Sequence, residues 1–254
     1  MKIAVAGKGG VGKSTISAAL SRYFAARGFE IYAVDADPDL SLGTVLGLPD
    51  AVLEKLRPVS EMHDVIKEKS RSSGAFFSLN PEVGDLLDSC SIHFDNIRFL
   101  KMGALKKGGT SCYCRENSIL HALMRLLLLD KKEMVLLDLG AGIEHLTRGT
   151  AGGVDLMLIV SEPTPVSLKT ATTIEALATD LGIPRTAVVI NKVTGADDRE
   201  LYRSVFGRQD VLGEIDDDSE VRRRYTSDPF NEAIEKIGRR ILEMDLYAAE
   251  GVGG

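Results

Sequence analysis

The chain has 254 residues, of which 44% are hydrophobic and 27% charged, with 31 basic side chains against 37 acidic ones. This length and apolar content predict a folded domain with a sizeable core and exclude the disordered and fibrous classes. A net charge of -6 argues against nucleic acid as the main partner, because phosphate binding normally leaves a basic surface. No apolar run approaches the roughly 20 residues that span a bilayer, and no secretory signal opens the chain. We expect a cytoplasmic protein that binds neither membrane nor nucleic acid.

Short apolar runs alternate with helical patterns along the chain. Runs this short are typical of strands buried on both faces of a parallel sheet. The expected strands are residues 3–6, 31–34, 97–102, 134–137, 156–160 and 187–190, and the expected helices are residues 13–27, 116–129, 166–181 and 231–246. Strands that alternate with long helices indicate βαβ units. The sequence therefore predicts an α/β fold with a doubly wound, mostly parallel sheet.

Residues 43–96 are the least regular part of the chain, with three prolines and a Ser-Ser-Gly turn. We expect short helices and loops there that cap one end of the sheet, so that residues 1–254 form a single domain. Residues 251–254, three of them glycine, are expected to be frayed. The basic run at residues 222–224 is interpreted as a solvated helix face in preference to a polyanion site.

The first strand is followed by a complete phosphate-binding motif. Residues 7–14 read G-K-G-G-V-G-K-S, which matches G-x-x-x-x-G-K-[ST] between a strand and a helix. Glycines let successive backbone N–H groups turn toward phosphate oxygens, and the following helix adds its positive end. In such loops the lysine reaches the β- and γ-phosphates and the serine hydroxyl binds Mg²⁺. The predicted nucleotide contacts are Gly9, Gly10, Val11, Gly12, Lys13, Ser14 and Thr15, with Ser14 as the magnesium ligand.

A second lysine opens this loop, because Lys8 stands five residues before Lys13. It lies too far round the loop to duplicate the role of Lys13. The segment K-G-G-V-G-K-S resembles the deviant Walker A branch of P-loop NTPases, which contains MinD, ParA, Mrp-type iron–sulfur carriers, the nitrogenase iron protein and nickel-insertion ATPases. The resemblance implies a homodimer in which Lys8 crosses the interface to the partner's nucleotide, as an arginine finger does. The alternative is a solvent-exposed loop lysine.

The same resemblance implies roles for aspartates that follow two of the strands. Asp37, in the segment D-A-D-P-D, is expected to orient the attacking water. Asp35 and Asp39 are further candidates for the magnesium shell, although Asp39 serves equally well as a helix N-cap. Asp138 closes an apolar run as a Walker B aspartate does, which places it near Mg²⁺. Residues 139–142 are expected to form a second switch whose backbone N–H groups sense the γ-phosphate.

Asn191 and Lys192 directly follow a predicted strand and look like the base-recognition motif of P-loop NTPases. An Asn amide donates and accepts at once, which suits an adenine ring. Guanine-specific enzymes carry N-K-x-D, whereas position 194 here is Thr194. ATP and ADP are therefore the expected nucleotides. A third base contact from residues 214–217 is left open.

Two of the three cysteines, Cys112 and Cys114, are separated by one residue in a Gly- and Ser-rich segment at residues 108–116. On extended backbone, residues i and i+2 point the same way, so both thiolates can bind one metal ion. One chain supplies two sulfurs, whereas a soft transition metal takes about four ligands. A two-fold dimer supplies the missing pair on its axis. The remaining cysteine, Cys90, is expected to be a buried structural thiol.

The C-x-C pair and the stretch A-G-I-E-H at residues 141–145 together resemble the CooC family, whose ATPases serve nickel insertion into carbon monoxide dehydrogenase. The resemblance extends from residue 1 to about residue 246. It implies an ATP-dependent homodimer that binds Ni²⁺, with Zn²⁺ as a competitor, and acts on apo carbon monoxide dehydrogenase. Two alternatives are kept: a positioning or partition ATPase like MinD or ParA, and an iron–sulfur carrier or reductase like the nitrogenase iron protein.

Overall fold

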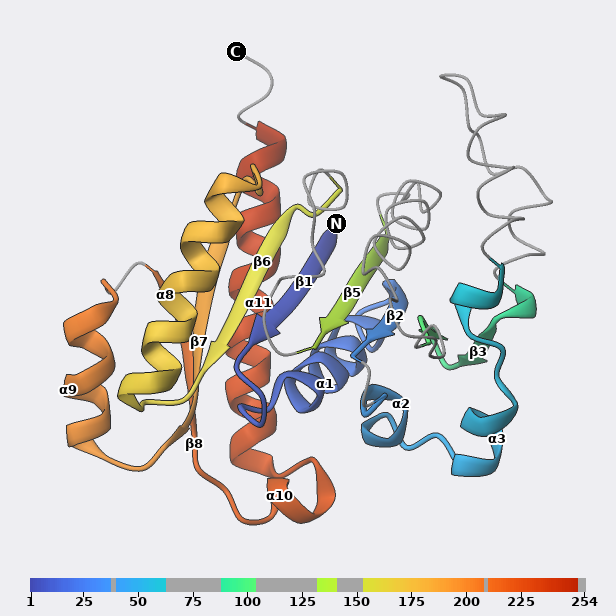
Figure 1. The fold of residues 1–254 in the computed structure, drawn as a ribbon, viewed down its shortest axis with the longest axis horizontal. Helices are drawn as coiled ribbons and strands as arrows, with labels where there is room; N and C mark the ends of the chain where they lie inside the picture. Colours follow the sequence, from blue (N-terminus) through green and yellow to red (C-terminus); the bar gives the residue numbers. More distant parts are fainter. Residues whose placement is uncertain (38–39, 63–87, 104–131, 141–152, 208–209, 251–254) are drawn as a thin grey trace, which may run out of the picture.

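The computed structural model describes residues 1–37, 40–62, 88–103, 132–140, 153–207 and 210–250. Its centre is an eight-stranded sheet with the order β3-β4-β2-β5-β1-β6-β7-β8 (Figure 1). The strands are β1 (Lys2–Gly7), β2 (Glu30–Ala36), β3 (Ser91–Phe94), β4 (Ile97–Lys101), β5 (Glu133–Leu139), β6 (Leu156–Ser161), β7 (Thr186–Val193) and β8 (Val211–Asp216). All neighbouring strands pair in parallel except β3 and β4, which are antiparallel. The predicted α/β class and mostly parallel sheet are confirmed.

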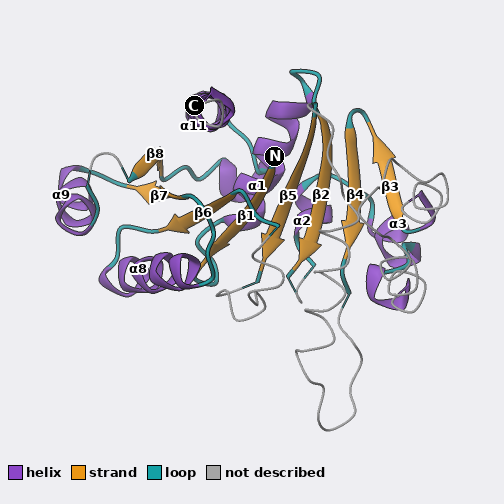
Figure 2. Cartoon of the chain, turned by 90° about the horizontal axis from the view of Figure 1, so that it is seen from above, coloured by secondary structure: helices purple, strands orange, loops and turns teal. Residues whose placement is uncertain are grey.

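Helices cover both faces of this sheet (Figure 2). Helices α1 and α11 pack on one face, whereas α8 and α9 pack on the other. The described helices are α1 (Lys13–Ala25), α2 (Leu42–Val45), α3 (Asp50–Lys55), the 3-10 helix η1 (Val59–Met62), α8 (Pro165–Asp180), α9 (Ala196–Val205), α10 (Val221–Arg224) and α11 (Asp228–Glu250). The short helices α2, α3 and η1 agree with the expected irregular region.

Successive side chains of the central strand β1 point to opposite faces of the sheet, and both faces are covered by helices, so its apolar run is continuous. Ile3 and Val5 of β1 pack with α1 and α11, while Ala4 and Ala6 pack with the α8 layer. All four side chains are fully buried. A strand with helices on both sides has no solvent face, so its sequence shows no polar alternation. The same reasoning accounts for the apolar runs of β5 and β6.

Three described elements were missed by the sequence prediction. Strand β3 lies where only helices and loops were expected, and it is an edge strand with no buried residue, so it lacks an apolar run. Strand β8 is the other edge and carries acidic residues that pair with Arg199 of α9. Helix α9 has a low apolar content and a single buried side chain, that of Tyr202. Elements at the margin of the sheet thus gave the weakest patterns.

Among the described residues, no helix is both long and apolar enough to cross a bilayer. The expected helix at residues 116–129 and the tail at residues 251–254 lie outside the described residues, as does most of the expected capping region. The strands β1, β2, β5 and β6 all end on the side where α1 begins (Figure 1). In a doubly wound sheet, ligands bind at the carboxyl ends of the strands near the point where strand order reverses.

Candidate nucleotide-binding site

The predicted phosphate loop connects β1 to α1 at the carboxyl edge of the sheet. Gly10 has φ 82° and Gly12 has φ 98°, in the left-handed region that favours glycine. Gly12 is also the N-cap of α1, and as a glycine it has no side chain with which to cap that helix end. The first N–H groups of α1 and its positive dipole end are therefore left available for an anion.

The side of the phosphate loop that faces β6 and β7 is crowded. A Cβ added to Gly7 would lie 2.2 Å from the carbonyl oxygen of Val160, and one added to Gly12 would lie 2.5 Å from Asn191 Nδ2. Both distances are too short for a real side chain. Val11, between these glycines, is buried. A side chain at position 7 would clash with the backbone of β6, whereas at position 12 the Asn191 amide would have to move and the positive φ would add strain.

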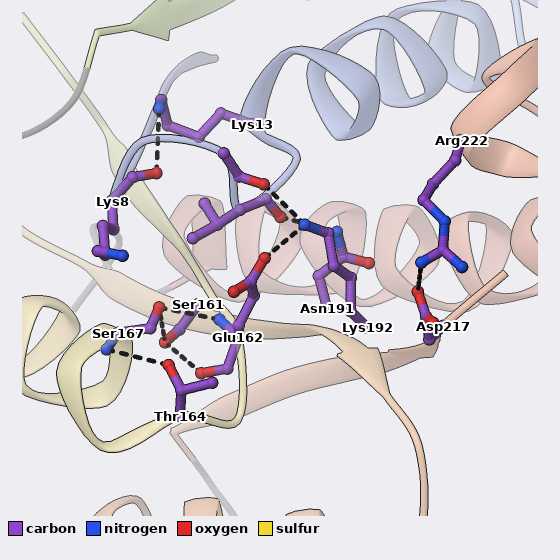
Figure 3. Close-up of polar contacts among 12 residues, drawn as sticks. Lys8, Lys13, Ser161, Glu162, Thr164, Ser167, Asn191, Lys192, Asp217 and Arg222 are labelled. Carbon is purple, nitrogen blue, oxygen red and sulfur yellow. Dashed lines mark hydrogen bonds and ion pairs between the residues drawn. The ribbon is translucent and has the colours of Figure 1, made fainter. Parts of the chain in front are cut away.

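The two lysines of the motif have different surroundings. Lys13 is only 6% exposed, and its Nζ lies 3.4 Å from the carbonyl oxygen of Lys8. The Lys8 side chain is exposed, and its ammonium points away from that of Lys13 (Figure 3). Gly9 and Gly10 are exposed as well. Lys13 therefore lies over the loop of its own chain, whereas Lys8 faces outward.

An acidic group sits beside Ser14, where a magnesium ion is expected. Asp138 at the end of β5 is completely buried, and its Oδ1 accepts a hydrogen bond of 3.3 Å from the Ser17 hydroxyl. Among the described residues, its buried Oδ2 has no hydrogen-bond partner. Burial raises the pKa of Asp138 to about 6, with the Ser14 hydroxyl and the Lys13 ammonium acting in the opposite direction. A buried oxygen without a partner next to a hydroxyl ligand fits a hydrated Mg²⁺ ion.

Ser41 is a neighbour of this site that sequence reasoning missed. Its hydroxyl lies 2.7 Å from the Ser14 hydroxyl. It is the N-cap residue of α2, and nothing in the sequence around it points to the phosphate loop. The contact links the loop to the segment that follows β2.

Asp35 holds the segment that contains Asp37. Asp35 Oδ1 accepts from the Asp37 N–H at 3.2 Å, and Oδ2 accepts from the Leu42 N–H at 2.9 Å. Burial and the neighbouring Asp138 raise the pKa of Asp35 to about 7. Asp37 is half-buried at the end of β2, and Asp39 lies outside the described residues. Because both Asp35 oxygens face backbone donors, we assign Asp35 to positioning this segment.

The predicted base-recognition residues lie against the phosphate loop. Asn191 Nδ2 donates to the Val11 carbonyl at 2.8 Å, and Lys192 Nζ donates to the Gly10 carbonyl at 2.7 Å (Figure 3). Lys192 also forms an ion pair with Glu162, which was not among the predicted residues. The structure thus places Asn191 and Lys192 at the nucleotide site, while their contact with a base stays a prediction.

A cavity of about 870 Å³ lies between β8 and α11. Its lining includes residues 214–217, where a third base contact was left open. Two arginines of the adjacent basic run pair with acids, Arg222 with Asp217 and Arg224 with Glu220. These pairs agree with the interpretation of residues 222–224 as a solvated helix face.

The expected nickel ligands Cys112 and Cys114 lie outside the described residues, and so do residues 141–142 of the expected second switch and the A-G-I-E-H stretch at residues 141–145. Within the described part of the chain, no group of three or more His, Cys, Asp or Glu side chains is placed to hold a metal ion. Cys90 is 1% exposed, and burial raises the pKa of its thiol to about 11. The expectation of a buried thiol at Cys90 is confirmed.

The family model described as the CobQ/CobB/MinD/ParA nucleotide-binding domain matches residues 2–229. The chain belongs to this family. Membership supports nucleotide binding by this chain. The predicted placement in the MinD/ParA branch of P-loop NTPases is confirmed.

Two relatives in this family match almost the whole chain. An uncharacterized ATP-binding protein of Methanocaldococcus jannaschii is 40% identical over 96% of this chain and 98% of its own length. The carbon monoxide dehydrogenase accessory protein CooC of Rhodospirillum rubrum is 41% identical over 87% of this chain and 86% of its own length. The predicted resemblance to the CooC family is therefore confirmed.

Solved structures of family members share the fold. MinD of Pyrococcus horikoshii complexed with Mg-ADP has a TM-score of 0.67 at 18% identity, covering 94% of this chain and 95% of its own. A plasmid partition protein of Borrelia burgdorferi bound to AMPPNP has a TM-score of 0.70 at 15% identity, covering 96% of this chain and 98% of its own. At such identities the likeness shows the architecture alone.

Proposed function

We propose that this protein is an ATP-hydrolysing, homodimerising metallochaperone that binds nickel and assists its insertion into carbon monoxide dehydrogenase. The observation that carries the ATPase part is a buried Lys13 ammonium close enough to favour ionisation of Asp138, whose buried Oδ2 has no hydrogen-bond partner among the described residues. A phosphate-binding lysine beside an unsatisfied carboxylate oxygen is the arrangement that a magnesium–triphosphate complex completes.

Each side chain has a defined part in hydrolysis. Backbone N–H groups of residues 9–15 and the Lys13 ammonium bind the β- and γ-phosphates. When bound, Mg²⁺ offsets the negative charge that develops on the phosphate oxygens. Ser14 would supply a hydroxyl ligand to this ion, and the Asp138 carboxylate would help to hold it from the end of β5. Asp37, held by Asp35 at the end of β2, orients the attacking water toward the γ-phosphate.

ATP is preferred over GTP because the chain lacks the acidic residue that reads guanine. Asn191 offers one donor and one acceptor, and Thr194 stands where guanine-specific enzymes have aspartate. Competition of ATP and GTP for a fluorescent ADP analogue measures this preference. Equal affinity for the two triphosphates would contradict the assignment.

The dimer is proposed because Lys8 has no target in its own phosphate site. Its side chain is exposed and directed away from Lys13. In a two-fold dimer, each Lys8 reaches the nucleotide of the other subunit and acts there as an arginine finger does. ATP then holds the two subunits together, and hydrolysis weakens the contact.

The metal site is proposed at Cys112 and Cys114 of both subunits, where four thiolates on the two-fold axis complete one shell. Nickel is the assigned cargo because the CooC relative is a carbon monoxide dehydrogenase accessory protein, and Zn²⁺ competes for the same thiolates. The ATP-bound dimer holds the metal, and hydrolysis favours its transfer to apo carbon monoxide dehydrogenase. Coupling between ATP and metal is expected at about 1–3 kcal/mol, in both directions.

The decisive experiment compares Lys8→Ala with Lys55→Ala, a control in which an exposed lysine is removed from α3. We expect the Lys8 variant to bind Mg-ADP normally, to remain monomeric with ATP and to lose at least 100-fold in hydrolysis rate. The control should behave as the wild type. ATP-dependent dimerisation and full hydrolysis by the Lys8 variant would contradict the proposal.

The alternatives are distinguished by separate assays. A positioning or partition ATPase would sediment with anionic vesicles or DNA in the presence of ATP. An iron–sulfur protein would be brown and would contain iron and acid-labile sulfide. A thiolate site loaded with nickel or zinc contains neither. Iron and sulfide analysis of the anaerobically purified protein distinguishes these two alternatives.

A further inference from the structure

Glu162 lies at the centre of a set of contacts that hold the phosphate loop from outside. It stands directly after β6, and its carboxylate pairs with the Lys192 ammonium, which also donates to the Gly10 carbonyl at 2.7 Å. Asn191 makes the parallel contact with the Val11 carbonyl at 2.8 Å. Figure 3 shows these side chains reaching the loop from the same side.

Peptide geometry connects these outer contacts to the inner surface of the loop. In a planar trans peptide, the C=O of one residue and the N–H of the next point in opposite directions. A Gly10 carbonyl held outward by Lys192 therefore directs the Val11 N–H inward. In the same way, Asn191 on the Val11 carbonyl directs the Gly12 N–H inward. These N–H groups are among the donors that a phosphate needs.

The backbone at Lys192 is itself unusual. Its φ is 62°, in the left-handed region that a lysine rarely adopts, and the β7–β8 register shifts between Asn191 and Val193. This conformation is unfavourable for a residue with a side chain, and surrounding contacts must maintain it. The ion pair with Glu162 is one such contact. The unfavourable conformation indicates that the direction of the Lys192 side chain matters.

Glu162 is fixed in place by a buried serine pair. The hydroxyls of Ser161 and Ser167 lie 2.9 Å apart, and the Glu162 N–H donates to Ser167 Oγ at 3.0 Å. Thr164 caps α8 by accepting from the Ser167 N–H at 3.3 Å. Glu162 is thus tied to the rigid first turn of α8. Its side chain is 26% exposed and that of Lys192 is 35% exposed, so solvent only partly screens their attraction.

We propose that Glu162 is a positioning residue of the nucleotide site, which acts through Lys192 on the Gly10–Val11 peptide and presets the phosphate loop before nucleotide arrives. This inference rests on the proposed nucleotide function and adds to it a residue that follows β6. The loop then binds phosphate without first turning its peptides, which lowers the cost of ordering on binding.

The test is a double-mutant cycle with Glu162→Ala and Lys192→Ala, read out as Mg-ADP affinity. The control is Glu200→Ala, which removes an exposed carboxylate from α9. We expect each single variant at the site to bind Mg-ADP about tenfold more weakly. The double variant should bind no more weakly than Lys192→Ala alone, because Glu162 acts through Lys192. Glu200→Ala should match the wild type.

Hydrogen exchange of the loop supplies an independent readout. In nucleotide-free protein, a peptide covering residues 7–14 should exchange faster in both single variants, while peptides from β1 and β6 keep their protection. Wild-type affinity of Glu162→Ala, or effects that multiply to about 100-fold in the double variant, would overturn the proposal. If the alanine variant does not fold, Glu162→Gln takes its place in the same cycle. Failure of the wild type to bind Mg-ADP would instead refute the proposed nucleotide function.

Discussion

Asp35 and Asp138 stand side by side in parallel register at the ends of β2 and β5, and both are fully buried. Two adjacent carboxylates without a cation are unfavourable, since each disfavours ionisation of the other and burial disfavours both. The pKa of Asp35 is raised to about 7 and that of Asp138 to about 6. A cation bound at this edge would favour the ionised form of both carboxyls and so lower both pKa values.

Replacing Asp138 with Asn should stabilise the metal-free protein while abolishing Mg²⁺-dependent hydrolysis. The pKa of Asp138 is about 6 in the fold against an ordinary value of 3.8, so the folded carboxyl keeps its proton where the unfolded chain has lost it. Wild-type stability therefore falls as pH rises from about 4 to about 6. Above that range we expect Asp138→Asn to be more stable by about 2 kcal/mol in denaturant titrations with EDTA.

The control for this change is the same pair of titrations at pH 4. There the difference in the free energy of unfolding between wild type and variant should shrink. With Mg-ATP present, the order should reverse, because only the wild type gains the stabilisation of a bound complex. A variant that is less stable than the wild type without metal at neutral pH would show that Asp138 has a structural role instead.

Gly12→Ala should weaken nucleotide binding and destabilise the fold. The residue has φ 98°, and a Cβ there would lie 2.5 Å from Asn191 Nδ2. We expect a loss of about 1–3 kcal/mol and at least tenfold weaker Mg-ADP binding. Thermal melts and calorimetric titration measure the two effects.

Gly47→Ala is the matched comparison, because Gly47 has φ 80° but open space around the position of a Cβ. That variant should show only the backbone cost, of about 1 kcal/mol, and normal nucleotide affinity. Equal effects of the two substitutions on Mg-ADP binding would indicate that crowding by Asn191 is unimportant.

Cys90 should resist alkylation in the native protein. Burial raises the pKa of its thiol to about 11, so almost no thiolate is present at pH 8, and the side chain is 1% exposed. Iodoacetamide treatment followed by peptide mass mapping should modify Cys90 only after unfolding. Cys112 and Cys114 provide the internal comparison, since the proposed site requires both to react without metal and to be protected with it. Rapid native modification of Cys90 would contradict its structural assignment.

The sequence predicted those parts of the fold in which one strong local signal suffices. The phosphate loop needs glycines at fixed positions, and the central strands need unbroken apolar runs because helices cover both faces. The edge strands β3 and β8 were not predicted. Many of their side chains are exposed to solvent or form ion pairs, so their sequences lack a continuous apolar run. Their place in the sheet depends on partners that are distant in the chain.

Within the site, sequence motifs identified which residues take part but not what each one contacts. Asn191 and Lys192 were predicted to read the base, and the structure places both on loop carbonyls. Glu162 carried no motif, since its role depends on the position of Lys192, 30 residues away in the chain. Ser41 was missed for the same reason: it stands 27 positions after Ser14, and no local pattern indicates that the two hydroxyls meet.

The most direct test of the account is the amount of nickel bound per chain, measured by elemental analysis and native mass spectrometry with and without Mg-ATP. We predict one nickel ion per two chains, found only in the dimer, bound more tightly with Mg-ATP, and lost in the variant with both Cys112→Ala and Cys114→Ala, which still binds Mg-ADP as a monomer. Stoichiometric nickel binding that survives the double substitution, or one nickel ion per monomer, would contradict a site shared between two subunits.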